Sequence, residues 1–174
     1  MITTNDDEIA RQCRLLRAHG MERRYYHDIL GYNFRMTDLH AAIGLSQLRR
    51  MGEFTARRRA NAAFLSSHID NQHVVAPRAR EAAGHVWHQY TVRIVGMSRD
   101  EAIKQLTAAG VGTGVFYPVP AHQQAHIRER GLDRGVNVPE AERAAREVLS
   151  LPVHPALAAS DLEEIVRAVN GLHA

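Results

Sequence analysis

A length of 174 residues with 45% hydrophobic content suffices for one domain with a buried core, and a single cysteine excludes an internal disulfide framework. The net charge is only +3, and Glu53 lies within the arginine cluster at 49–59, which is typical of a solvated helix face and argues against a nucleic-acid-binding protein. The N-terminus has no basic region followed by an apolar run, which is the pattern of a signal peptide. No stretch approaches the roughly 20 apolar residues that span a bilayer. We therefore expect a soluble, cytoplasmic protein that binds neither nucleic acid nor membrane.

Helices alternate with short strands along the chain. Capping boxes are expected where Asn5 precedes Glu8, where Ser98 precedes Glu101 and where Ser160 precedes Glu163. With the apolar spacing, they predict helices over 5–20, 37–48, 53–69, 98–109, 139–149 and from Ser160 onward, and strands over 86–95, 113–117 and just before Pro152. Strands separated by helices predict an α+β fold in which helices cover a small sheet.

Residues 31–48 join a polar, aromatic-flanked turn to an apolar helix. Thr37 is a good N-cap, and the apolar residues after it cover most of the helix circumference, which predicts a helix buried on several sides. Gly44 inside the helix suggests a close neighbouring backbone. Asn33 and Arg35 lie on the turn, where residue types alone favour capping and solvation of a loop over a binding site.

The histidine pairs do not predict a metal site. His85 and His88 lie three apart on the expected strand, so their side chains point to opposite faces. His122 and His126 share a helical spacing, but Gln123 replaces the glutamate of the zinc motif and no third ligand is evident. His88 by itself is expected to be a hydrogen-bonded core histidine on an apolar strand face.

Five segments in order carry the strongest signal: 1–10, 31–48, 85–93 (HVWHQYTVR), 110–122 (GVGTGVFYPVPAH) and 149–155 (LSLPVHP). Together they resemble the C-terminal half of the DegT/StrS family of pyridoxal-phosphate-dependent sugar aminotransferases, over nearly the whole chain. The resemblance implies the C-terminal small domain plus the interdomain helices of an aspartate-aminotransferase-type fold. Residues 1–174 are then one domain, with 1–36 a remnant of the large-domain, dimer-contact segment, 37–70 the interdomain helices and 71–174 the small C-terminal domain.

The same resemblance implies roles for individual residues. Members of the family act as dimers and move an amino group, usually from glutamate, onto a keto sugar attached to a nucleotide. Asn33 matches the asparagine that reaches the cofactor phosphate of the neighbouring subunit, and Arg35 matches the arginine that helps to shape that turn. Tyr117 and His122 match residues that face the substrate pocket, and His88 is a weaker candidate for lining it. Phe116 stands where other members often carry a polar residue such as histidine, so an altered pocket is expected.

Lys104 is the only lysine of the chain. Pyridoxal chemistry needs a lysine amine for the internal Schiff base and an acidic partner for the pyridine nitrogen. Lys104 lies opposite Ile103 and Leu106 on its helix and four residues after Asp100, which predicts an exposed salt bridge instead. The resemblance implies that the catalytic lysine and aspartate lie upstream of Met1, so we expect no catalytic residue in this chain.

Two hypotheses remain open. In the first, the chain is the C-terminal part of a pyridoxal-phosphate-dependent aminotransferase for nucleotide-linked keto sugars, inactive alone and active with a large domain from another polypeptide or a longer native product. In the second, it is a non-enzymatic remnant or dimerisation module that pairs with an intact aminotransferase. Both predict a homodimer or association with a large-domain-bearing chain. The apolar helix from Thr37 further predicts self-association of the isolated chain.

Overall fold

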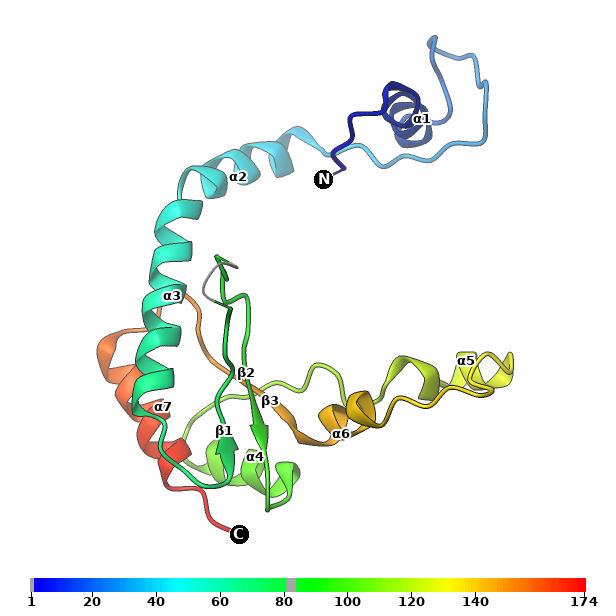
Figure 1. Ribbon diagram of the computed structural model, residues 1–174. Helices are drawn as coiled ribbons and strands as arrows, with labels where there is room; N and C mark the ends of the chain where they lie inside the picture. The colour runs from blue at the N-terminus through cyan, green and yellow to red at the C-terminus, as the bar shows by residue number, and fades with distance from the viewer. Residues whose placement is uncertain (1, 81–83) are drawn as a thin grey trace. The chain divides into compact units, whose positions relative to one another are not determined.

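The computed structural model describes residues 2–80 and 84–174 (Figure 1). Within these ranges the chain has seven α-helices and a three-stranded antiparallel sheet, which confirms the α+β class. The chain divides into two compact units, Met1–Arg50 and Met51–Ala174. Their boundary falls inside the stretch 37–70 that was expected to hold the interdomain helices, so each unit is described separately.

The first unit contains helices α1 (Asp7–Arg17) and α2 (Asp38–Arg49). The α1 N-cap is Asp6, whose carboxylate accepts from Ile9 N at 3.0 Å, so the cap predicted at Asn5 is one residue too early. Asp6 is the N-cap because its carboxylate accepts a hydrogen bond from the backbone N–H three residues later, which is the N-cap geometry. The helix also ends at Arg17, before the predicted stop at Gly20.

Helix α2 begins as predicted but is not buried within this chain. The Thr37 hydroxyl accepts from His40 N at 3.3 Å, which confirms the N-cap. No α2 residue is buried, and Leu39 and Leu48 are 71% and 62% exposed. A Cβ on Gly44 would meet nothing within 4 Å, so the predicted close backbone approach is wrong for the described chain. The apolar surface of α2 therefore lies open, because no other segment described here covers it.

The second unit follows the order α3 (Met51–His68), β1 (Val74–Val75), β2 (Tyr90–Ile94), α4 (Arg99–Ala108), the 3-10 helix η2 (Ala121–Gln123), α5 (Ala125–Glu129), α6 (Pro139–Glu147), β3 (Val148–Leu151) and α7 (Ala159–Asn170). The strands pair in the order β1, β2, β3, with Val74 opposite Ile94 and Tyr90 opposite Leu151. The central strand is thus β2, which Figure 1 shows between its two neighbours.

Strand β2 divides its side chains between the core and the other face of the sheet. Tyr90, Val92 and Ile94 are buried, whereas Thr91 and Arg93 between them are half-buried, as the period of two requires. The buried cluster takes side chains from α3, β2, α4, β3 and α7 and from the short segments that follow α4, β3 and α7: Ala62, Leu65, Tyr90, Val92, Ile94, Ala102, Leu106, Val111, Leu149, Leu151, Val153, Leu162, Ile165, Val169 and Leu172. One face of the sheet therefore packs on three helices, as the sequence predicts.

Two predicted strands are shorter in the structure. The strand expected over 86–95 begins only at Tyr90, because Gly84 and Trp87 have positive φ values of 55° and 50° and bend the chain before it. The strand expected over 113–117 is reduced to an isolated bridge between Gly114 and Ser150. Residues on either side of Gly114 therefore form no ladder in the described chain.

Two predicted capping boxes are also absent. Ser98 precedes α4 but its side chain makes no capping hydrogen bond. At α7 the Asp161 carboxylate accepts from Ala158 N at 2.8 Å, in place of the box expected between Ser160 and Glu163. The helix begins at Ala159, two residues ahead of the predicted first turn, so Asp161 and not Glu163 reaches the free backbone N–H.

Tyr90 predicts a loss of stability at high pH. Its buried ring is hydrogen-bonded through the hydroxyl to Ser66 Oγ at 2.9 Å, and burial raises the pKa of the phenol although this hydrogen bond partly lowers it. The folded chain then holds the proton more tightly than the unfolded chain. The contribution to the free energy of unfolding is full below the ordinary pKa of about 10 and is lost as the pH rises through the raised value.

We expect Tyr90→Phe to make stability less dependent on pH above about 10, at a cost of about 1 kcal/mol near neutrality for the lost hydrogen bond. Urea unfolding midpoints at a neutral and an alkaline pH, compared between the two proteins, measure this. An equal alkaline loss in both proteins would contradict the assignment to Tyr90.

Candidate functional site

The turn that carries Asn33 is fixed against the end of α1 by backbone contacts. Three hydrogen bonds join the two segments: Tyr32 N to Leu16 O at 2.7 Å, His19 N to Tyr32 O at 2.8 Å and Phe34 N to Arg17 O at 3.0 Å. A Cβ on Gly31 would lie 1.9 Å from Gly20 N, so only glycine permits this approach. The turn is therefore a rigid support for the side chains that follow.

Asn33 and Arg35 form one hydrogen-bonded pair on this support. Arg35 Nε donates to Asn33 Oδ1 at 2.9 Å, and an Arg35 terminal nitrogen lies 3.4 Å from His19 Nε2. With Oδ1 occupied as an acceptor, the Asn33 amide nitrogen keeps its N–H donors, and no described group accepts from them. Both side chains are exposed. An amide and a guanidinium presented together are donors that suit an anionic phosphate.

The substrate-facing residues expected in the second unit lie on three separate segments. Tyr117 is 74% exposed and contacts Phe116 edge to face at 6.0 Å. His122 is half-buried, with Nε2 3.0 Å from Glu142 Oε1. His88 is exposed, so the interpretation as a core histidine on a strand face is wrong, since β2 begins two residues after it. Over the described ranges, no hydrogen bond or ring contact joins His88, Tyr117 and His122 to one another.

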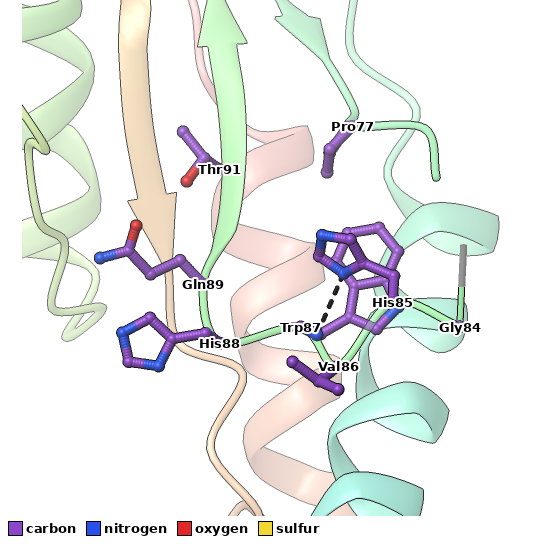
Figure 2. Close-up of a pocket in the computed structure, with 8 residues that line it drawn as sticks. All are labelled: Pro77, Gly84, His85, Val86, Trp87, His88, Gln89 and Thr91. Carbon is purple, nitrogen blue, oxygen red and sulfur yellow. Dashed lines mark hydrogen bonds between the residues drawn. The ribbon is translucent and has the colours of Figure 1, made fainter. Parts of the chain in front are cut away.

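His88 does lie on the rim of a hollow of about 560 Å³. Figure 2 shows His88, Gln89 and Thr91 on one side of this hollow and Pro77, His85 and Trp87 on the other. The rings of His85 and Trp87 are 4.3 Å apart, and His85 Nδ1 accepts from Trp87 N at 3.0 Å. Tyr117 and His122 do not line this hollow.

Two arginines in the middle of α3 hold the rim in place, a role that the sequence did not indicate. Arg58 donates to the carbonyl oxygens of Trp87 and His88 at 3.2 and 3.1 Å. Arg59 donates to the carbonyl oxygens of His85 and Gly84 at 3.0 and 2.8 Å. These carbonyls precede β2 and lack ladder partners, so the guanidinium groups satisfy them. The cluster was expected to be a solvated helix face.

Lys104 makes the exposed salt bridge that was predicted, with a different partner. Its Nζ lies 3.1 Å from Glu101 Oε2, and its side chain is 76% exposed. Asp100, the partner expected, pairs with Arg99 at 3.1 Å instead. A lysine in this setting has none of the enclosure that surrounds a covalent cofactor site.

The described residues hold neither a cluster of metal ligands nor a helix that could span a membrane. Residues 2–80 and 84–174 contain no group of three or more His, Cys, Asp and Glu side chains that could hold a metal ion. Over the same ranges, every helix is too short or too polar to cross a membrane.

Comparison with solved structures defines the class of protein. The fold matches the crystal structure of S. venezuelae DesV, solved in complex with a ketimine intermediate, with a TM-score of 0.88 and 34% identity. The match covers 97% of this chain and 45% of the DesV chain. A second match, the aminotransferase TlmJ from Streptoalloteichus hindustanus, has a TM-score of 0.84 and 33% identity over 95% of this chain and 45% of that chain. The fold is therefore that of part of an aminotransferase.

Sequence comparison defines the family. The DegT/DnrJ/EryC1/StrS aminotransferase family matches residues 1–170, and the chain belongs to it. Among curated relatives, the pleiotropic regulatory protein of Geobacillus stearothermophilus is 39% identical over 172 residues, covering 97% of this chain and 45% of that protein. The chain spans about 45% of the length of such relatives and corresponds to their C-terminal part, which confirms the resemblance seen in the five segments.

Proposed function

We propose that the chain is the C-terminal part of a pyridoxal-phosphate-dependent aminotransferase acting on nucleotide-linked keto sugars, and that its lysine-bearing large domain lies outside this chain. In this proposal residues 1–36 belong to the dimer-contact segment, 37–70 to the interdomain helices and 71–174 to the small domain. The observation that carries it is the Asn33–Arg35 pair, held on a rigid turn with unused donors. Family membership over residues 1–170 supports it.

The residues present suit the cofactor phosphate. Pyridoxal phosphate, when bound, supplies the electron sink that amino transfer needs. The Asn33 amide and the Arg35 guanidinium would hold its phosphate across a dimer interface, because charge-assisted hydrogen bonds from such donors are strong and directional. Arg35 also keeps Asn33 in the orientation that leaves the amide N–H groups available. Lys104, exposed and paired with Glu101, would take no part.

The substrate would contact residues of the second unit. Tyr117, His122 and His88 are proposed to face a nucleotide sugar, and each has at least part of its side chain accessible. The dTDP-3-amino-3,6-dideoxy-alpha-D-galactopyranose transaminase of Aneurinibacillus thermoaerophilus, 33% identical over 97% of this chain and 45% of that enzyme, is named for such a compound. Its name supports a nucleotide sugar as the substrate class here.

A second candidate function is a non-enzymatic module that pairs with an intact aminotransferase. Two observations favour it. The open apolar surface of α2 is suited to association, and the Geobacillus relative is named as a regulatory protein. This candidate predicts binding to a family enzyme without restoring any activity.

Reconstitution separates the two. We expect the full chain alone to transfer no amino group from glutamate to a nucleotide-linked keto sugar, and its mixture with a polypeptide carrying the large domain of a family enzyme to do so in the presence of pyridoxal phosphate. Lys104→Arg removes the only amine side chain of the chain and should leave the activity of the mixture unchanged. Activity of the chain alone that Lys104→Arg abolishes would refute the proposal, and a stable but inactive complex would favour the second candidate.

A further inference from the structure

His122 and Glu142 form a pair whose geometry the proposed function does not explain. His122 lies in η2 and Glu142 in the first turn of α6, and Nε2 is 3.0 Å from Oε1. The side chains are only 16% and 33% exposed. Within residues 2–80 and 84–174, no other histidine ring nitrogen pairs with a carboxylate. This contact therefore distinguishes His122 from the other histidines described.

The hydrogen bond to the carboxylate places a proton on Nε2. An ionised carboxylate only accepts hydrogen bonds, so Nε2 must carry the N–H. When the imidazole carries this N–H alone, Nδ1 keeps its lone pair. No described group hydrogen-bonds to Nδ1, and no buried side-chain nitrogen or oxygen among the described residues lacks a partner. Nδ1 is therefore within reach of solvent or a ligand, and in the Nε2–H form it is an acceptor.

Glu142 is itself held by the packing of α6. Ala145, one turn later, is buried, and its carbonyl oxygen accepts from Arg99 at 2.6 Å. At the end of the helix, Glu147 accepts from Arg93 of β2 at 2.7 and 2.5 Å. These contacts tie α6 to β2 and α4, so the carboxylate that receives the His122 proton has a fixed position.

We propose that Glu142 is a positioning residue: it holds the His122 proton on Nε2 and so presents Nδ1 as an acceptor for a hydroxyl or N–H group of the nucleotide sugar. The part that concerns substrate rests on the proposed function. The alternative is a contact that only ties η2 to α6 and leaves the proton position without consequence. Glu142→Gln removes the charge but keeps the geometry, because the new amide oxygen accepts the same hydrogen bond.

The proton position is measured on the full chain by itself. Nitrogen NMR of the ¹⁵N-labelled chain reports which ring nitrogen carries the proton, and His122→Ala identifies the signals. We expect the Nε2–H form in the wild type and in Glu142→Gln, and a mixture of both forms in Glu142→Ala. Glu140→Ala, which removes a carboxylate paired with Arg143 from the same turn, is the matched control and should leave His122 unchanged. A wild-type proton on Nδ1, or no change in Glu142→Ala, overturns the proposal.

The role toward substrate is measured in the reconstituted mixture. Glu142→Ala should raise KM for the nucleotide sugar roughly three- to tenfold, as expected for one misdirected hydrogen bond, with kcat nearly unchanged. Glu142→Gln should recover most of the wild-type KM. An unchanged KM in Glu142→Ala overturns the substrate role. An inactive wild-type mixture refutes the proposed function instead, while the tautomer change would still support Glu142 as the residue that positions the ring.

Discussion

Asn33→Ala should weaken the binding of pyridoxal phosphate to the reconstituted enzyme about 10- to 100-fold. The substitution removes the amide N–H donors that are proposed to face the phosphate, and a hydrogen bond to a charged group is worth about 1.5–3 kcal/mol. It also removes the acceptor that orients Arg35 Nε, at 2.9 Å in the present pair. Titration of the mixture with pyridoxal phosphate, followed by its visible absorbance, gives the dissociation constant.

Two further variants make this result specific. Arg35→Lys keeps the positive charge but loses the planar guanidinium that contacts Asn33. We expect it to lose less affinity for pyridoxal phosphate than Asn33→Ala does. Gln12→Ala removes an amide from α1 of the same unit that donates to Glu8 Oε1 at 2.8 Å, and it should leave cofactor affinity unchanged. Equal affinity in the Asn33→Ala and wild-type mixtures would show that the turn does not hold the phosphate.

The isolated chain should self-associate through α2, with a second copy covering its apolar surface. Leu39 and Ile43 lie one turn apart and are 71% and 54% exposed, and burial of such a side chain is worth about 1.5–3 kcal/mol. Replacing both by glutamate should weaken association at least about 100-fold. Light scattering then measures a monomer mass of 19.5 kDa for the variant and a larger mass for the wild type at the same concentration.

Gln47→Glu adds a charge to the same helix at a polar position and is the control for charge alone. It should associate like the wild type. Addition of the large-domain polypeptide should compete with self-association, because both would cover the same apolar surface. A wild-type chain that stays monomeric at high concentration would contradict the assignment of α2 as an association surface.

Local patterns predicted the elements that form from neighbouring residues. The strand predicted over 86–95 is present at 90–94 with one buried face, and the helix predicted from Ser160 onward buries Leu162, Ile165 and Val169. Strand β1 was not predicted, because two residues are too few to show an alternation of apolar and polar side chains. Its pairing with β2 also joins segments about 20 residues apart. The apolar pattern of α2 predicted that something covers the helix, but a sequence pattern does not say whether the cover lies in the same chain.

In the candidate site, too, contacts between neighbouring residues could be predicted and contacts between distant residues could not. Asn33 and Arg35 are two residues apart, so their proximity could be predicted from the sequence. The contacts of Arg58 and Arg59 with the loop before β2 span 25 to 30 residues, and a run of arginines gave no sign of them. The pairing of His122 with Glu142 likewise depends on how η2 and α6 pack. The two residues are 20 positions apart, and no sequence pattern indicates that they form a pair.

The most direct test of the central claim is to locate the lysine that binds the cofactor. The reconstituted mixture, loaded with pyridoxal phosphate, is reduced with borohydride, which converts a lysine–cofactor imine into a stable secondary amine. Peptide mass spectrometry then identifies the modified residue. We predict that the label lies on a lysine of the large-domain polypeptide and that Lys104 carries none. Stoichiometric label on Lys104, with or without the large domain, would contradict the account.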